Sequence, residues 1–468
     1  MRRKMYDDLV EWKKDVNKKA LVICGCRQIG KTYTVLEFAK KNYSQHLYIN
    51  LEDEEGVREI FENKDISAEN IIKTLSFIKR IDFSKDTVLI LDEVQSSSGA
   101  YSALKSLNDC KKCDVIATGS FLGLEISRLQ RLTPMGHVDF RDMWPMDFEE
   151  FLWATGMTEE HTNYLRECIN NRKRIEPIIC DRMNEEFRKY ILVGGFPEAV
   201  KTYVETGSYH KVLGKLKDIS KVIGQDAEKY SSSTDRKKIK KCIESTPQQL
   251  STNRGKFIYS AIEKNPNASR RTYENALNWL EESGLIRYCY NLTQTVSPLI
   301  MRVRQGSFKV YLTDTGILSS MLKEDVAEKF MKRDSHSDYG ILMENAIACA
   351  LMKNDHPLYF YEKANSTLEI DFILSIHGEI MGVEVKSGRD KRSKSLKEAY
   401  LEQHMFKHAV KLSEGNVFTD ENGIQNLPLF APCFMRMTCK EDSLPVRDDG
   451  ELMAAFDAVL GKGNPERI

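Results

Sequence analysis

A glycine-rich segment between a predicted strand and a predicted helix constrains this chain most. Residues 25–32 read Gly-Cys-Arg-Gln-Ile-Gly-Lys-Thr, with an apolar run at 20–24 before them and an amphipathic segment after them. Glycines let main-chain N–H groups turn inward around an anion, at the positive end of the helix that follows. The pattern predicts a phosphate-binding loop that binds a nucleoside triphosphate.

Two side chains of this loop have the chemistry that a triphosphate needs. Lys31 supplies a point charge for the outer phosphates, and Thr32 supplies a hydroxyl for the accompanying Mg²⁺. We therefore expect ATP and Mg²⁺ as cofactors. The residues expected to contact the nucleotide are Gly25, Cys26, Arg27, Gln28, Ile29, Gly30, Lys31, Thr32 and Tyr33.

Length and composition indicate a chain of several domains. A chain of 468 residues is too long for one compact core, so we expect two to four domains. Hydrophobic residues at 41% and charged residues at 29% are ordinary for a soluble protein, and no apolar run approaches membrane-spanning length. The eleven cysteines lack paired metal spacing, and the basic N-terminus lacks an apolar core for secretion. We therefore expect free thiols, a cytoplasmic location and no membrane partner.

The order of apolar runs and helical patterns predicts an α/β fold. Over residues 1–150, strands at 21–24, 47–51, 88–91 and 115–118 alternate with helices, which predicts a parallel, doubly wound P-loop NTPase sheet. Two helical stretches and then paired strands at 286–292 and 308–313 predict a winged-helix domain over 241–325. A last block, 335–440, has a helix and then strands at 358–361, 368–376 and 380–386, and residues 441–468 form a tail.

The apolar run at 87–91 ends in two adjacent carboxylates, Asp92 and Glu93. In a P-loop protein such a strand presents Asp92 to the magnesium shell, and Glu93 then orients or activates the attacking water. Taken alone, this pattern is usually a capped strand. Its position about 60 residues after a full phosphate loop favours the catalytic interpretation.

A third apolar strand, 115–118, ends in hydroxyl residues. Its functional interpretation is a strand between the other two, from which Thr118 or Ser120 hydrogen-bonds the γ-phosphate or its water; the alternative is a strand end with turn residues. Arginines follow downstream: Arg128, Arg131 and Arg141. We select Arg131 as the residue offered to a neighbouring active site, a role worth ~10³ to 10⁵ in rate. A solvated helix face is the commoner explanation for any single arginine.

Motifs over nearly the whole chain carry a family resemblance. Beyond the loop they are Leu91-Asp-Glu-Val-Gln95, Thr118-Gly-Ser120, Thr133-Pro-Met-Gly-His-Val138, Trp144-Pro-Met-Asp-Phe-Glu-Glu-Phe-Leu152, Gly194-Gly-Phe-Pro-Glu198, Thr246-Pro-Gln-Gln-Leu250 and Glu274-Asn-Ala-Leu-Asn-Trp-Leu280. With them the sequence resembles the AAA+-type ATPases of bacteria and archaea whose C-terminal domain has no assigned function. The resemblance implies an ATPase core with a small helical lid at 151–240, a winged helix and a restriction-endonuclease-like C-terminal domain. It also makes a homo-oligomer an expected assembly. One departure is His137, which stands where a basic residue is expected.

Two predicted strands of the last block carry a metal-type pattern. Asp371 lies in an alternating strand, and 13 residues later (384 − 371) Glu384 and Lys386 lie on one face of the next strand. A hairpin through His377-Gly378 would bring Asp371 beside that pair, so the two carboxylates would hold Mg²⁺ or Mn²⁺. Lys386 would orient a water or stabilise developing charge, and Glu344 on the preceding helix would add a carboxylate. This is the pattern of the PD-(D/E)XK nuclease-like fold. The alternative is a surface salt bridge between Glu384 and Lys386.

Local basic charge favours DNA as the macromolecular partner. The formal net charge is zero, so contact with nucleic acid must come from patches. Residues 386–397 contain six basic residues and one acidic residue, and Arg270 and Arg271 open the predicted second helix of the winged-helix segment. Such a run is ordinarily a solvated face, but beside a phosphodiester site it would attract a nucleic-acid backbone.

Three functions are compatible with these patterns. The first is an ATP-driven protein that processes nucleic acid through its winged-helix and nuclease-like domains. The second is a nucleotide-dependent switch whose downstream domains bind DNA or a protein partner without cleavage. An ATP-dependent remodeller of proteins is the weakest, because no segment resembles a substrate-pore loop with an aromatic tip.

Overall fold

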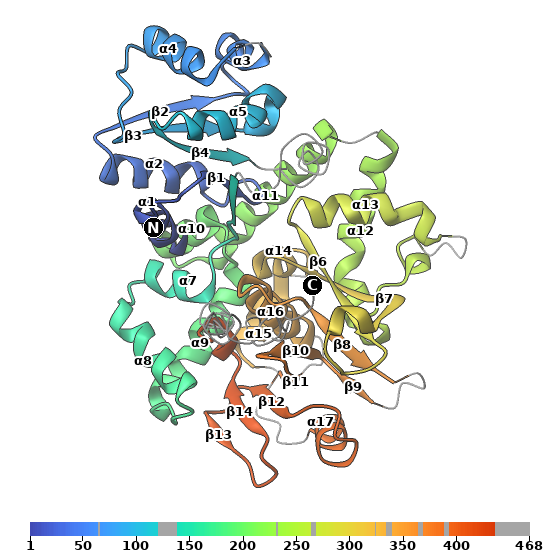
Figure 1. Cartoon of the computed structure of the whole chain (residues 1–468). Helices are drawn as coiled ribbons and strands as arrows, with labels where there is room; N and C mark the ends of the chain where they lie inside the picture. Colours follow the sequence, from blue (N-terminus) through green and yellow to red (C-terminus); the bar gives the residue numbers. More distant parts are fainter. Residues whose placement is uncertain are drawn as a thin grey trace, which may run out of the picture.

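The computed structural model describes residues 1–63, 66–119, 138–230, 233–263, 268–322, 324–333, 339–363, 368–387 and 393–435. Ser120, Arg128, Arg131, His137 and the predicted tail at 441–468 lie outside these residues. Figure 1 shows a blue N-terminal sheet with its helices at the top, green helices beside and below it, and orange and red strands at the bottom.

The N-terminal sheet has five parallel strands in the order β2-β3-β4-β1-β5. They are β1 (Ala20–Cys24), β2 (Gln45–Asn50), β3 (Thr87–Asp92), β4 (Asp114–Gly119) and β5 (Val138–Asp142). The helices of this part are α1 (Lys4–Lys14), α2 (Lys31–Asn42), α3 (Glu55–Glu62), α4 (Ala68–Lys79) and α5 (Ser98–Asp109). All six residues of β3 are buried, as expected for a central parallel strand between helical layers. The four predicted strands are present, and β4 lies between β1 and β3 as predicted.

Five helices follow the sheet. They are α7 (Phe148–Ala154), α8 (Glu159–Asn170), α9 (Pro177–Val193), α10 (Pro197–Thr206) and α11 (Tyr209–Tyr230). A capping box between Asp147 and Glu150 begins α7, because each side chain accepts a hydrogen bond from the other's main-chain nitrogen. Gly195, between α9 and α10, has no room for a side chain, since a Cβ would lie 2.0 Å from the oxygen of Met146.

A two-stranded ribbon connects the third part of the chain to the fourth. The helices α12 (Ser233–Ser251) and α13 (Arg270–Glu282) precede β6 (Ile286–Leu292) and β7 (Val303–Leu312), which pair in antiparallel. On its other edge β6 pairs in parallel with β8 (Tyr359–Glu362), and β8 pairs with β9 (Glu369–Ile370). One sheet, β7-β6-β8-β9, therefore contains strands from the predicted winged-helix segment at 241–325 and from the predicted last block at 335–440.

The last sheet has the order β10-β11-β12-β14-β13. Its strands are β10 (Phe372–Ile376), β11 (Glu379–Val385), β12 (His408–Ser413), β13 (Phe418–Thr419) and β14 (Gln425–Pro428). The helices of this part are α14 (Thr315–Ser320), α15 (Glu324–Met331), α16 (Gly340–Lys353) and α17 (Lys394–Lys397). The single strand predicted at 368–376 is two strands, β9 and β10, in different sheets. Asp371 lies at the break, where its Oδ2 accepts a hydrogen bond of 2.7 Å from the nitrogen of Val385.

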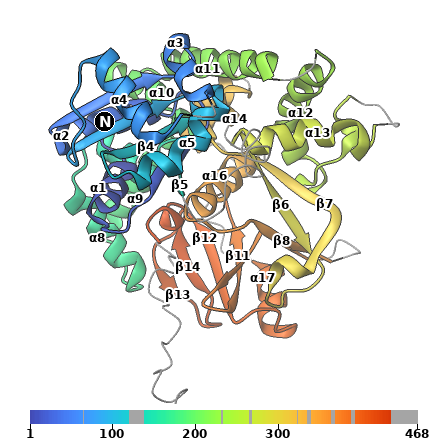
Figure 2. The same ribbon diagram turned by 45° about the horizontal axis from the view of Figure 1, so that its top comes forward.

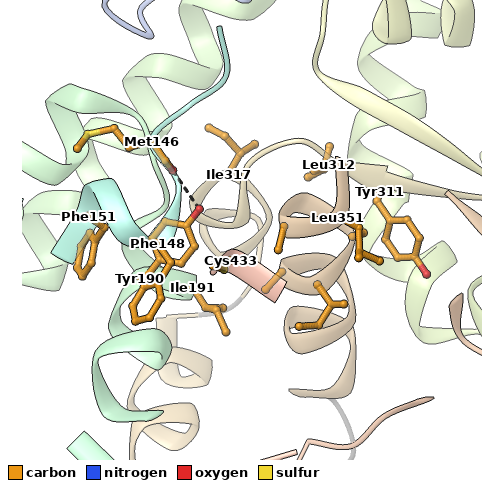
Figure 3. Close-up of a cluster of buried hydrophobic side chains, with 14 of the residues drawn as sticks. Met146, Phe148, Phe151, Tyr190, Ile191, Tyr311, Leu312, Ile317, Leu351 and Cys433 are labelled. Carbon is orange, nitrogen blue, oxygen red and sulfur yellow. Dashed lines mark hydrogen bonds between the residues drawn. The ribbon is translucent and has the colours of Figure 1, made fainter. Parts of the chain in front are cut away.

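One hydrophobic core extends across these parts. Phe148 and Tyr190 from the helical segment, Ile317 from α14 and Leu351 from α16 belong to one buried cluster (Figure 3). The Tyr190 hydroxyl within it donates a hydrogen bond of 3.0 Å to the oxygen of Met146. Apolar burial therefore fixes the helical segment against the C-terminal part. None of the described helices combines the length and hydropathy that a bilayer crossing requires.

Candidate nucleotide site and C-terminal carboxylate cluster

The glycine-rich loop lies between the end of β1 and the start of α2. Gly30 precedes the helix with φ 89°, in the left-handed region that glycine adopts without strain. At Gly25 a Cβ would lie 2.3 Å from the oxygen of Met143, so only glycine fits there. Met143 is held in this position because its nitrogen donates a hydrogen bond of 2.7 Å to the oxygen of Cys24. The local geometry thus explains why glycine occupies both positions.

Lys31 is held inside the loop. Its Nζ donates hydrogen bonds of 2.8 Å to the main-chain oxygens of Gly25 and Cys26. The side chain is 7% exposed, and burial lowers the pKa of Lys31. The ammonium group therefore lies among carbonyl oxygens at the base of the loop, where a phosphate would supply the opposite charge.

Asp92 accepts hydrogen bonds from three hydroxyl groups. Thr32 Oγ1 from α2 lies 2.8 Å from Asp92 Oδ2, and the Tyr48 hydroxyl from β2 lies 2.9 Å from the same oxygen. Thr118 from β4 donates to Asp92 Oδ1. Asp92 is 5% exposed, so these hydroxyls replace the water that the carboxylate loses. A carboxylate beside a threonine hydroxyl is a pair of hard oxygen ligands, which fits Mg²⁺.

Glu93 has a left-handed main chain. Its φ of 51° and ψ of 46° are uncommon for a residue with a side chain and cost about 1–3 kcal/mol. Its nitrogen donates a hydrogen bond of 3.0 Å to Asp92 Oδ1, and the Gln95 side chain donates to Glu93 Oε2. The strained turn directs the main chain away from the line of β3 immediately after Asp92. Such strain is typical of functional sites.

The other predicted residues of the loop differ in exposure. Cys26 and Ile29 are buried, so they would contact a nucleotide only through the main chain. Gln28 has φ 64°, and Arg27 Nη2 lies 3.7 Å from Glu52 Oε2. The Tyr33 ring is 60% exposed on α2. Their roles stay predictions.

Arg3 is a component of the loop region that sequence reasoning missed. Its Nη1 and Nη2 donate to the main-chain oxygens of Ile29 and Trp144 at 2.5 and 2.6 Å, and its Nε lies 3.1 Å from Glu150 Oε1. Arg3 is 5% exposed although it is the third residue of the chain. No local pattern reveals this role, because the two main-chain partners lie 26 and 141 positions away.

The helix α16 and the strands β7 and β9 bring a second charged cluster together. Lys309 Nζ lies 2.9 Å from Glu344 Oε1 and 3.0 Å from Glu369 Oε1, and Lys309 is 1% exposed. The Tyr311 hydroxyl also donates to Glu344. Burial lowers the pKa of Lys309, but the charges of Glu344 and Glu369 outweigh burial and the pKa is raised. Lys309 therefore lies in the cluster as a buried cation.

Asp371 and Glu384 lie beside this cluster. Burial and the charge of Glu344 raise the pKa of Asp371 to about 7, although Lys309 opposes the shift. Glu384 is buried, with Oε1 2.7 Å from Lys386 Nζ. Glu384 Oε2 accepts no hydrogen bond within the described residues.

The structure tests the predicted arrangement of these carboxylates only in part. The hairpin through His377-Gly378 is present, because β10 and β11 pair in antiparallel there. Among the described residues no group of three or more His, Cys, Asp or Glu side chains is arranged to hold a metal ion. One carboxylate, Glu344, is instead occupied by Lys309 and Tyr311. The metal site of Glu344, Asp371 and Glu384 stays a prediction.

Comparison with known proteins supports the nucleotide site. Residues 17–152 match a family model described as "AAA domain". The N-terminal segment is an AAA-type ATPase domain. Residues 184–328 and 339–431 match two models described as domains of unknown function, DUF8612 and DUF4143. The ATPase part of the resemblance is confirmed, whereas the restriction-endonuclease-like part stays a prediction.

Relatives with known sequences or structures are distant. The uncharacterized protein MJ1637 of Methanocaldococcus jannaschii is 22% identical over 435 residues, which cover 89% of this chain and 84% of that protein. A Walker-type ATPase of Pyrococcus abyssi has 14% identity and a TM-score of 0.40, with 69% of this chain and 95% of that chain covered. The ORC2 protein of Aeropyrum pernix has 12% identity and a TM-score of 0.31, with 71% and 93% covered. Likenesses this weak carry no information on function.

Proposed function

We propose that this protein binds and hydrolyses ATP at the loop of β1 and α2 and uses the cycle to act on nucleic acid. The observation that carries the ATPase part is the 2.8 Å contact between Thr32 Oγ1 and Asp92 Oδ2 beside the buried Lys31. It unites the loop and the acidic strand end, which lie 60 positions apart in the sequence.

Each residue of the site has a role in this proposal. The main-chain N–H groups of the loop bind the phosphates, and Lys31 neutralises their charge. Thr32 and Asp92 would hold Mg²⁺, which supplies charge neutralisation between the outer phosphates when bound. Glu93 orients the attacking water and accepts its proton, and Thr118 keeps the carboxylate of Asp92 in place. Ser120 and Arg131 stay candidates for contacts with the γ-phosphate.

Two substitutions separate binding from turnover. Lys31→Ala removes the charge at the base of the loop, so we expect nucleotide binding to be lost in calorimetric titration. Glu93→Gln keeps the shape but not the base, so we expect binding to persist while turnover falls about 10²- to 10⁴-fold. Lys41→Ala is the matched control, because Lys41 lies on the same helix in an exposed pair with Glu37. Normal turnover in Glu93→Gln would refute its role.

The turn between α13 and β6 lies close to the loop, and this closeness supports coupling to nucleic acid. A Cβ at Gly284 would lie 3.9 Å from the nitrogen of Cys26 and 3.9 Å from the Trp144 ring. The Arg287 guanidinium lies 4.9 Å from the centre of that ring. A nucleotide that moves the loop would therefore press on the turn that follows α13. We propose that this contact transmits the nucleotide state to the winged-helix segment, whose Arg270 and Arg271 face solvent.

Measurements of DNA binding with and without ATP test this coupling. DNA affinity of the wild-type chain, measured by fluorescence anisotropy, should differ between ATP-bound and nucleotide-free protein. The substitution Arg287→Gln removes the guanidinium that packs over the Trp144 ring, and it should reduce that difference while leaving the chain folded by circular dichroism. Equal affinity in both states would contradict the coupling.

Metal-dependent cleavage is a second candidate. It is favoured by the unpartnered oxygen of buried Glu384 and by the carboxyl of Asp371 beside Glu344. A hard divalent ion would be held by these carboxylates and would polarise a phosphodiester, and Lys386 would position the water. Labelled DNA with Mn²⁺ or Mg²⁺ should then be cut by the wild type but not by Asp371→Ala or Lys386→Ala. Intact DNA with an ATP-dependent change in affinity would instead establish the switch without cleavage.

A further inference from the structure

A groove of about 310 Å³ lies between α13 and the β6–β7 ribbon. In Figure 2, α13 lies beside the upper ends of these two strands. One wall is formed by side chains of α13 that are spaced three or four residues apart and therefore lie on one face of the helix. The other wall is the ribbon. Its lining includes Asn278, Tyr288, Tyr290, Arg304, Gln305 and Phe308. Its volume is at the lower end of the ~300–1,000 Å³ range for small-ligand sites, so it suits one planar group and not a duplex.

Aromatic rings form the ribbon side of this groove. Tyr288 and Tyr290 are two positions apart on β6, which places them on one face, and their ring centres are 5.6 Å apart at an interplanar angle of 28°. Phe308 on β7 packs edge-on against Tyr288 at 5.0 Å. Tyr288 and Tyr290 are only partly buried, so their rings also face the groove. Partly exposed tyrosine rings are a surface on which another planar ring stacks.

Three polar side chains that line the groove, those of Asn278, Arg304 and Gln305, have no hydrogen bond or ion pair among the described residues. The two amides offer donors and acceptors of the kind that bind the edge of a base. Arg304 lines the same groove without an ion pair among the described residues, so its guanidinium is available to a phosphate.

The acidic residues of the groove are largely neutralised. Arg270 binds Glu274 with two hydrogen bonds, of 3.0 and 2.6 Å, so this pair carries no net charge. Burial raises the pKa of Glu281, and the charge of Arg287 opposes this shift, so Glu281 also has a basic neighbour. The groove thus presents aromatic faces, amide groups and one unpaired guanidinium.

We propose that this groove binds an unstacked base of a single-stranded nucleic acid, with Arg304 on the adjoining phosphate. The inference rests on the proposed action on nucleic acid and specifies its form. Within a nucleic acid, only a splayed base presents a free ring face and a free edge together, and the groove offers tyrosine rings to the face and amides to the edge. A duplex keeps its bases stacked and could not enter a groove of this size.

The experiment uses the full-length protein and a single-stranded oligonucleotide that contains 2-aminopurine. Binding should change 2-aminopurine fluorescence as the base stacks on tyrosine. Tyr290→Leu and Arg304→Gln should each weaken binding by about tenfold or more, as expected for loss of a stacked base or a phosphate contact. The controls are Tyr164→Leu and Arg174→Gln on the helical segment, which are exposed and should leave affinity unchanged. Far-UV circular dichroism and an unaltered urea unfolding midpoint show that a variant is folded.

An abasic strand makes the test specific to the base. In a double-mutant cycle, the losses of binding free energy caused by removal of one base and by Tyr290→Leu should not be additive, because both changes remove the same stacking contact. Full additivity at every position of the strand would overturn the inference. Binding of free adenosine monophosphate without binding of the strand would also overturn the inference.

Failure of the inference is distinguishable from failure of the proposed function. If the wild type binds neither single-stranded nor duplex nucleic acid, the proposed function fails and the inference falls with it. If it binds nucleic acid with an affinity that Tyr290→Leu leaves unchanged, only the inference fails.

Discussion

Arg3 donates a hydrogen bond to the main-chain oxygen of Ile29, inside the phosphate-binding loop. The same guanidinium reaches the oxygen of Trp144 and the carboxylate of Glu150. The first helix of the chain is thereby connected to the loop and to the segment before α7. With the Ile29 carbonyl held by Arg3, the loop is pre-formed for an anion.

Loss of this contact should weaken nucleotide binding more than turnover. We expect Arg3→Gln to raise KM for ATP by about tenfold, because one charge-assisted hydrogen bond contributes ~1.5–3 kcal/mol, while kcat changes less. Steady-state kinetics measure the split. Arg2→Gln is the control, since Arg2 is exposed and paired with Asp7 and Glu159. Equal effects of both substitutions would contradict a role for Arg3 in shaping the loop.

Tyr48 should tune Asp92, the proposed magnesium ligand. Its hydroxyl donates to the oxygen of Asp92 that also contacts Thr32. Tyr48→Phe removes one donor worth about 1 kcal/mol, so we expect an approximately fivefold change in the Mg²⁺ concentration for half-maximal ATPase activity. Tyr43→Phe is the matched control for Tyr48→Phe, because it also removes a hydrogen bond from a tyrosine hydroxyl to a carboxylate of the same sheet, that of Asp114. An identical Mg²⁺ dependence in all three proteins would exclude this role for Tyr48.

Lys309 should stabilise the C-terminal part strongly. Lys309→Met leaves Glu344 without its buried cation, whereas Glu369 keeps Arg254 at 3.6 Å, so we expect the free energy of unfolding to fall by about 3 kcal/mol in urea denaturation. Lys332→Met removes an exposed lysine that pairs with Glu328 and should cost no more than ~1 kcal/mol. A small, equal effect of both would show that the cluster does not depend on Lys309.

Asp371 should make stability depend on pH. Its pKa is raised to about 7 by burial and by Glu344, so the folded state binds a proton that the unfolded chain releases near pH 4. The free energy of unfolding should therefore fall as pH rises from about 4 to about 7, by at most about 1.4 kcal/mol for each pH step of one. Asp371→Asn should flatten this slope and be the more stable protein at pH 8. Urea unfolding at a series of pH values, with a chelator present, measures the free energy of unfolding of both proteins. The same dependence on pH in wild type and Asp371→Asn would refute the role of Asp371.

The geometry of the candidate nucleotide site was largely predictable because its signals are local. The run from Gly25 to Thr32 and the apolar strand before Asp92 are contiguous in sequence, and parallel strands bring their carboxyl ends to one edge. Tyr48 could have been found from its place on the neighbouring strand. Arg3 and Lys309 could not, because their partners lie far away in sequence and a lone basic residue has no periodicity.

The C-terminal strands illustrate a different limit. The alternation through 368–376 predicts one strand, and period two holds on both sides of Asp371. Hydrophobic alternation says which face is buried but not which neighbour a strand will pair with. That choice, made by tertiary contacts, places β9 and β10 in separate sheets.

The double pairing of β6 bears on how this protein can be dissected. A cut anywhere between residues 325 and 335 would strip β8 from β6 and expose a row of unpaired main-chain groups, with Tyr290 and Leu292 among them. Fragments made there should precipitate or pair edge to edge, even where each contains an intact motif. Neither half retains a closed sheet surface once the other is gone.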